Sequence, residues 1–189
     1  MTRLWLVRHG PTHVKAMVGW SDVPADLSDT AKIARLRNAL PDAPVVSSDL
    51  SRAVQTADVL TPAKRLPHDP ALREINFGAW EMQTFDAVSA ADPETIRAYW
   101  DTPGDVAPPM GESWNHVRRR VSDAIDHYLN MQLPDLIVVA HFGAILTQVQ
   151  RAKGISAYEA FGHKIDNLSV TQLTRHGDRW DVGMINHIP

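Results

Sequence analysis

Two histidines and two arginines lie at the ends of predicted strands or at the start of a predicted helix. Arg8 and His9 follow one short apolar run, His141 follows another, and Arg52 lies at the start of a helical pattern after a third. Guanidinium groups bind phosphate oxygens through paired, charge-assisted hydrogen bonds. A neutral imidazole among such groups can act as a nucleophile. These residue types predict a phosphate pocket in which a histidine attacks phosphorus.

Turnover of a phosphate ester needs one further group, which protonates the leaving oxygen and then activates water. Glu74, within the segment Leu72–Gly78, is the best candidate. Adjacent positive charge disfavours imidazolium and helps to keep His9 neutral, whereas a cationic His141 would stabilise charge on the phosphoryl oxygens. The backbone N–H groups of a helix that begins after His141 would add to the attraction for an anion.

Three apolar runs must bring these residues together. Leu4–Val7, Val45–Val46 and Leu136–Ala140 are typical of buried strands, and the first and third are continuous, as in parallel strands covered on both faces. In open α/β sheets, ligands bind beyond the carboxyl ends of the strands. We therefore expect the catalytic candidates to meet at one edge of a sheet.

Helical patterns separate these runs, with apolar residues at spacings of three and four. They cover residues 28–40, behind a Ser28 cap, and residues 49–60, 113–131 and 143–152. The C-terminal part instead alternates: Leu168–Arg175 leads into a turn at His176–Asp178, and a second strand begins near Trp180. This last pattern predicts a β-hairpin.

Strands that alternate with helices indicate an α/β fold. We expect three layers, α/β/α, with a mostly parallel sheet and a C-terminal β-hairpin. The chain length of 189 residues suits a single domain over residues 1–189. A less periodic stretch, rich in Asp and Pro, predicts a helical excursion beside the active site at about residues 79–130.

The composition narrows the class of partner. A net charge of −3 and a pI near 6.3 argue against binding of nucleic acid. The chain has no cysteine, which excludes disulfides, zinc–thiolate sites and cysteine nucleophiles. The first apolar run is too short for a signal peptide and no later run would span a membrane, so we expect a cytoplasmic protein. The oligomeric state stays open, with the hairpin edge as one surface through which a homodimer would form.

Four segments resemble the motifs of one known family. They appear in the family's order: Leu6–Thr12 with Arg-His-Gly, Ser47–Ala57, Leu72–Glu81 with the acid, and Val138–Gly143 with the second histidine. The chain is on this basis identified as a member of the histidine phosphatase superfamily, also called phosphoglycerate mutase-like. The Arg-His-Gly tripeptide alone is weak, but chance agreement of all four segments is not credible.

The resemblance implies a role for each matched residue. His9 would be the phosphorylated nucleophile and Glu74 the proton donor; Arg8, Arg52 and His141 would form the phosphate pocket, to which Thr12 would add a hydroxyl contact. No metal or organic cofactor is implied. His9 and His13 have the four-residue spacing of a helical metal pair, but the intervening Gly10–Pro11 argues against a helix there.

The sequence after the acid bears on the reaction. Ile75–Glu81 is similar to the small phosphatase branch of the family, which includes α-ribazole phosphatases, whereas cofactor-dependent mutases carry a different basic-aromatic sequence there. The resemblance therefore implies hydrolysis of a small phosphorylated metabolite, with α-ribazole phosphate as one candidate. A phosphoglycerate mutase is the alternative. A catalytically weak member kept for binding or regulation is the third hypothesis.

Several residues near the motifs have two interpretations. Phe142 replaces a glycine common in the family and would reshape the pocket wall, as would Pro11. Trp20 is a substrate-facing wall or a packing residue. Trp114 is expected in the core. The remaining alternatives concern the start of the late helix: Glu112 and Ser113 cap it or line the site, and Arg118–Arg120 form an exposed face or steer an anionic substrate.

Overall fold

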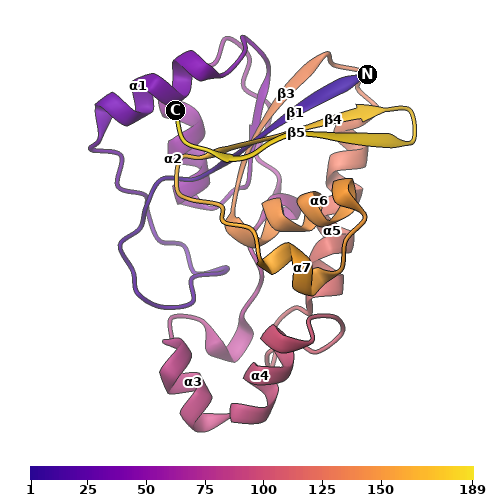
Figure 1. Ribbon diagram of the computed structural model, residues 1–189. Coiled ribbons are helices and arrows are strands. Elements are labelled where there is room, and N and C mark those ends of the chain that lie inside the picture. Colours follow the sequence, from indigo (N-terminus) through magenta and orange to yellow (C-terminus); the bar gives the residue numbers. More distant parts are fainter.

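The computed structural model describes all residues from Met1 to Pro189 and contains one five-stranded sheet, in the order β2-β3-β1-β4-β5 (Figure 1). Strands β1, β2 and β3 are parallel, and the C-terminal hairpin adds β4 and β5 in antiparallel pairing. The predicted α/β class and hairpin are confirmed, in a sheet that is mixed. The bounds are Thr2–Arg8 for β1, Val45–Ser47 for β2, Asp135–Ala140 for β3, Val170–His176 for β4 and Arg179–His187 for β5.

The register of the three parallel strands aligns their carboxyl ends. Arg8 at the end of β1 lies opposite Ala140 at the end of β3, and Ser47 at the end of β2 lies opposite Val139. The amide of His9 continues the ladder by donating to the carbonyl of Ala140 at 3.1 Å. The residues that follow these strands therefore enter one edge of the sheet, as the sequence predicts.

Helices α1 (Thr30–Ala39) and α2 (Ser51–Val59) cover one face of the sheet, where their apolar residues join a core with Val7, Val139 and their neighbours. The predicted Ser28 cap is wrong. Asp29 caps α1 instead, since its side chain accepts from the amide of Lys32, and carboxylates and hydroxyls compete for the same capping position. The Ser28 amide is turned to Asp26.

Helices α5 (Trp114–Leu129), α6 (Phe142–Lys153) and the short α7 (Ala157–Phe161) cover the other face. Trp114 is fully buried there, as expected for the core stripe of its helix. Ser113 is the N-cap of α5 and accepts from the amide of His116, which decides its role between the two alternatives. The helices on both faces complete the three layers.

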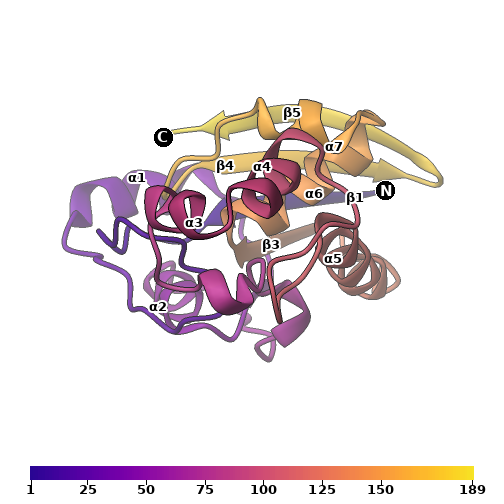
Figure 2. The ribbon, with the colours of Figure 1, turned by 90° about the horizontal axis from the view of Figure 1, so that it is seen from below.

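The helical excursion contains α3 (Phe85–Ala91) and α4 (Pro93–Asp101), capped by Thr84 and Asp92. Figure 1 shows both helices below the sheet, and Figure 2, seen from that side, shows them in front of it. Two 3₁₀ turns, Pro70–Leu72 and Gly78–Trp80, lie on the segment that leads from α2 into this excursion.

Two loops far apart in sequence are joined beside the sheet edge. The amide of Met17, in the loop after β1, donates to the carbonyl of Gln83 at 2.9 Å, and the amide of Met82 donates back to Met17 at 2.8 Å. The loop after β1 and the segment that carries Glu74 are thereby tied by their backbones. No helix combines the length and the hydropathy needed to cross a bilayer.

Candidate active site

His9 leaves β1 with its ring buried at the sheet edge. Its Nδ1 lies 2.6 Å from the carbonyl oxygen of Gly10. A carbonyl can only accept, so Nδ1 must carry the hydrogen and Nε2 must carry the lone pair of the neutral ring. The local backbone thus fixes the tautomer in which Nε2 carries the lone pair and is available for chemistry.

The environment of His9 keeps the ring neutral. Burial, followed by the positive charge of Arg52 and, to a smaller extent, Arg8, lowers the pKa of His9 to about 3, against the opposing effect of the bond to Gly10. The sequence led us to expect the effect of adjacent positive charge. Burial is the larger cause, because a desolvated imidazolium is costly wherever it sits.

His141 faces His9 from the end of β3. It occupies the N-cap position of helix α6 without a side-chain capping bond. It is fully buried, and the centroid of its ring lies 5.0 Å from that of His9. Neither ring nitrogen has a hydrogen-bond partner within the protein. Burial, His9 and then Arg52 lower the pKa of His141 well below its ordinary value. It therefore enters the site as a neutral donor rather than as a standing cation, although a bound dianion would favour its charged form.

Arg52 lies in the first turn of α2 and is 1% exposed. Its Nη2 donates to the carbonyl of Gly19 at 2.6 Å and its Nη1 to the carbonyl of Ser21 at 2.9 Å. Two carbonyls of one turn therefore set the plane of the guanidinium. Burial lowers the pKa of Arg52 while Glu74 opposes that shift, so Arg52 and Glu74 interact electrostatically.

Glu81 holds that same turn and was missed as a functional residue. Its carboxylate accepts from the amides of Gly19, Trp20 and Ser21 and from the hydroxyl of Ser21 at 2.6 Å. Burial acts to raise the pKa of Glu81, but the bonds from Ser21 and its neighbours outweigh it, and the pKa lies below its ordinary value. The only sequence signal was an acid at the end of the segment that resembles the family's acid motif.

Arg8, at the end of β1, contacts Ile165 and Phe142. Its Nη1 donates to the carbonyl of Ile165 at 2.6 Å, and its guanidinium carbon lies 5.5 Å from the centre of the Phe142 ring. Its Nε is buried without a partner in the protein. Because buried polar groups are normally satisfied, this nitrogen and those of His141 are candidates to bind a ligand that offers acceptor atoms.

Glu74 reaches the site from the segment between the two 3₁₀ turns. Its Oε1 accepts from the amide of Gly143 at 2.9 Å and from its neighbour Ile75 at 3.0 Å. Gly143 lies in the first turn of α6, so one of the helix's free N–H groups is already bound by this carboxylate. The predicted anion attraction of that helix end is to this extent used within the protein.

Trp20 and Thr12 are predicted to contact the substrate. The contacts of Trp20 lie with the Glu74 segment, and those of Thr12 lie within the loop after β1. The indole of Trp20 donates to the carbonyl of Glu74 at 2.8 Å, and its ring is covered by the guanidinium of Arg73 at 4.8 Å. Thr12, half-buried, lies in the loop after β1, where its hydroxyl accepts from the amide of Val14 at 3.5 Å. Trp20 therefore supports the backbone of the acid, and a contact of Thr12 with substrate stays a prediction.

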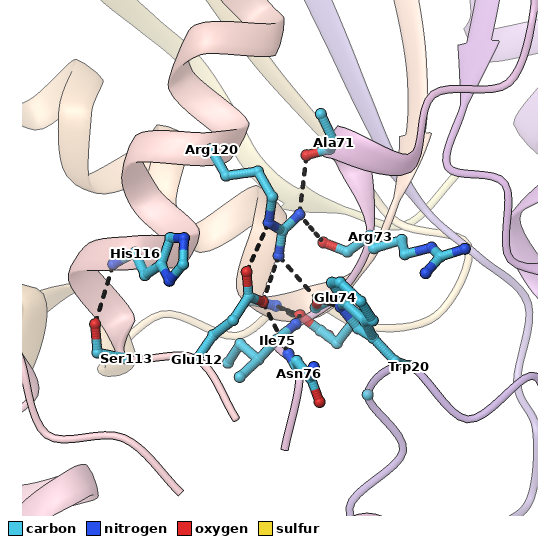
Figure 3. A network of polar contacts seen from close by, with 12 residues as sticks. Trp20, Ala71, Arg73, Glu74, Ile75, Asn76, Glu112, Ser113, His116 and Arg120 are labelled. Carbon is cyan, nitrogen blue, oxygen red and sulfur yellow. Dashed lines mark hydrogen bonds and ion pairs between the residues drawn. The ribbon is translucent and has the colours of Figure 1, made fainter. Parts of the chain in front are cut away.

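Arg120 overturns one expectation. Arg118 and Arg119 are exposed as predicted for the basic run, but the Arg120 side chain is only 16% exposed and points into a polar network beside Glu74 (Figure 3). It pairs there with Glu112 at 2.7 Å. Glu112 therefore neither caps α5 nor stands free above the site. The helical period places Arg120, but not its neighbours, on the side of α5 that faces the loop.

A comparison with known families decides the class of this site. The family model for the histidine phosphatase superfamily (branch 1) matches residues 4–188, almost the whole chain. The chain belongs to this superfamily. The four motif segments that resemble the family are thus parts of one continuous histidine phosphatase fold.

Relatives of this histidine phosphatase include both phosphatases and mutases. The chain is 27% identical over 175 residues to the adenosylcobalamin/alpha-ribazole phosphatase of Salmonella typhimurium, covering 87% of this chain and 86% of that protein. It is 27% identical over 191 residues to a probable phosphoglycerate mutase, GpmB, of Erwinia tasmaniensis, covering 95% and 88%. Its structure is similar to that of Bacillus stearothermophilus YhfR, with a TM-score of 0.91, 26% identity and coverage of 100% and 98%.

Proposed function

We propose that this histidine phosphatase hydrolyses phosphomonoesters of small metabolites through a phosphohistidine intermediate. The state of His9 carries the proposal. The carbonyl of Gly10 holds its Nδ1–H, and its pKa is lowered to about 3. Nε2 therefore keeps a lone pair at neutral pH, in a site where Arg8 and His141 have buried nitrogens without partners.

In the first half-reaction, Nε2 of His9 bonds to phosphorus while the bond from phosphorus to the ester oxygen breaks. Protonated Glu74 gives its proton to that oxygen, and the alcohol leaves. Arg8, Arg52 and His141 hold the phosphoryl oxygens as their charge is redistributed. Thr12 adds a hydroxyl contact, and Phe142, beside Arg8, contacts the substrate. Trp20 acts through the backbone of Glu74, to which its indole donates.

In the second half-reaction, ionised Glu74 takes a proton from water. The water oxygen bonds to phosphorus, the bond from phosphorus to Nε2 breaks, and inorganic phosphate is released. Glu74 is again protonated and His9 is again neutral, so the cycle closes without any redox partner. The same residues would return the phosphoryl group to an organic acceptor if water were kept out, which is the mutase alternative.

Two measurements on purified protein test the intermediate. The wild type should hydrolyse p-nitrophenyl phosphate and, when quenched after mixing with a ³²P-labelled ester, retain acid-labile label. His9→Ala should lose at least about 10³-fold in rate and all of the label, in the range seen when a nucleophile is removed. His187→Ala, which changes an exposed histidine, is the matched control. Labelling of His9→Ala, or a folded wild type without activity, would reject the proposal.

The substrate is tested with a panel. The relatives named above make α-ribazole phosphate and phosphoglycerates informative members, together with sugar phosphates. We expect phosphate release from at least one small ester. Isomerisation of 3-phosphoglycerate, primed with 2,3-bisphosphoglycerate, that far exceeds phosphate release would favour the mutase instead.

A further inference from the structure

Arg120 of α5 binds three backbone carbonyls of the segment that carries Glu74. Its Nη1 donates to the carbonyls of Ala71 at 2.9 Å and Arg73 at 3.1 Å, and its Nη2 to the carbonyl of Glu74 at 3.1 Å. Its Nε and Nη2 donate to Glu112 at 2.9 and 2.7 Å. A guanidinium has five N–H groups, and all of them are used here.

Glu112 closes the arrangement from the other side of Glu74. While one pair of bonds ties it to Arg120, its Oε2 also accepts from the amide of Asn76 at 3.0 Å. The segment from Ala71 to Asn76 is thereby held by its carbonyls before the acid and by an amide after it. Figure 3 shows Arg120 between this segment and Glu112.

We infer that Arg120, together with Glu112, is the positioning residue of the general acid. The inference rests on the role proposed above for Glu74. The Glu74 carboxylate binds its own neighbour's amide and that of Gly143, so its place follows from the backbone that Arg120 holds. A displacement of about 1 Å in a catalytic group can cost about 10²-fold in rate. Arg120 touches no reacting atom and acts only through this segment.

The leaving group provides a test that a purely structural role would not pass. Protonation by Glu74 matters more for the departure of phenol, a weak acid, than for that of p-nitrophenol. Arg120→Lys keeps the charge but replaces the five-donor fork by one ammonium. We expect it to lower kcat/KM for phenyl phosphate at least about 10-fold more than kcat/KM for p-nitrophenyl phosphate, within the range of general acid catalysis. The inhibition constant of inorganic phosphate should change by less than about twofold.

Three further proteins make the result decisive. Arg119→Lys, on the exposed part of the same helix, should behave like the wild type on both esters. Glu112→Gln should show the same selective loss as Arg120→Lys, and serves in its place if that variant does not fold. Glu74→Gln should show the full selective loss.

The outcomes separate the inference from the proposed function. Equal losses on both esters for Arg120→Lys, or a weaker inhibition by phosphate, would overturn the positioning role while Glu74→Gln still showed selectivity. If Glu74→Gln itself showed no selectivity, the acid role of Glu74 would fail. If His9→Ala stayed active, the phosphohistidine step would fail independently of both.

Discussion

Glu81 and Arg52 bind the same three-residue turn, Gly19–Ser21, through its opposite polar groups. Glu81 accepts from the amides of the turn, and Arg52 donates to its first and last carbonyls. The peptide units between them are thereby oriented from both sides. The carboxylate of Glu81 thus helps to position the guanidinium of Arg52 through this turn.

Glu81→Gln should weaken phosphate binding through this turn. The amide keeps one acceptor oxygen but loses the charge and the second acceptor, and charge-assisted hydrogen bonds are worth about 1.5–3 kcal/mol each. We expect the inhibition constant of inorganic phosphate to rise about 10-fold and kcat/KM to fall at least as much. Glu94→Gln, an exposed glutamate on α4, is the control and should change neither. Unaltered phosphate inhibition in Glu81→Gln would show that the turn holds without its charge.

Gly143 leaves no room for a side chain beside the acid. A Cβ at this position would lie 2.5 Å from Oε1 of Glu74 and 2.8 Å from Cδ1 of Ile75. Gly143→Ala should therefore move the Glu74 carboxylate and lower kcat at least about 10²-fold, since small misplacements of catalytic groups have effects of that size.

The stability of Gly143→Ala should not fall along with its activity, because alanine favours a helix over glycine by about 1 kcal/mol. Urea unfolding should show little loss of stability despite the lost activity. Gly104→Ala, where the nearest atom would be 3.8 Å away, is the matched control. Full activity in Gly143→Ala would mean that the Glu74 carboxylate can move without cost.

Buried His9 makes the protein less stable in acid. Its pKa is lowered to about 3 in the folded protein, whereas an unfolded histidine titrates near 6.5. Between these values the unfolded chain binds a proton that the folded chain does not, so the free energy of unfolding falls as the pH falls. One such group contributes a slope of up to about 1.4 kcal/mol per pH unit.

His9→Asn, which cannot titrate, should show a shallower dependence of unfolding free energy on pH between about pH 6 and pH 4. Denaturant melts at several pH values measure this slope. His187→Ala should keep the wild-type slope. If His9→Asn also kept it, His9 would not be the neutral, buried ring described above.

Phe142, a predicted substrate-contact residue, lies beside Arg8. Its ring lies 5.5 Å from the guanidinium carbon of Arg8, and contacts of this kind contribute about 0.5–1 kcal/mol at exposed sites and more when desolvated. Phe142→Ala should lower kcat/KM for p-nitrophenyl phosphate about two- to fivefold and shift relative rates toward bulkier esters. A steady-state comparison across the ester panel checks both effects, and an unchanged order of preference would exclude Phe142 as a specificity residue.

The sequence predicts the sheet edge well because the ends of strands can be recognised from neighbouring residues alone. Continuous apolar runs locate β1 and β3, and the residues after them must enter the edge whatever the details of packing. Helices α1, α2, α5 and α6 are found from their apolar spacing, with boundaries that differ by one to two residues at α5 and α6. The short α7 is not predicted, and α3 and α4 are predicted only as a helical excursion. Even the Ser28 error is local, since Asp29 beside it offers the same capping chemistry.

The polar residues that position the site from a distance cannot be recognised from neighbouring residues in this way. Glu81 binds a turn 60 to 62 residues away in the chain, and Arg120 binds carbonyls 46 to 49 residues away. Their partners are backbone groups, which every residue type has, so no residue pattern marks the contact. Arg120 within a basic run looks like an exposed face until the rotation of α5 is known.

The backbone bonds between Met17 and the residues Met82 and Gln83 have a consequence for partial unfolding. They fasten the loop that carries the carbonyls bound by Arg52 to the segment that follows Glu74. While these bonds hold, neither segment can detach and leave the other in place, so the turn bound by Arg52 and the segment of Glu74 should be displaced together. Local opening costs less free energy than global unfolding in most proteins. Partial unfolding on heating should then abolish the activity of a molecule in one step, while its sheet stays folded.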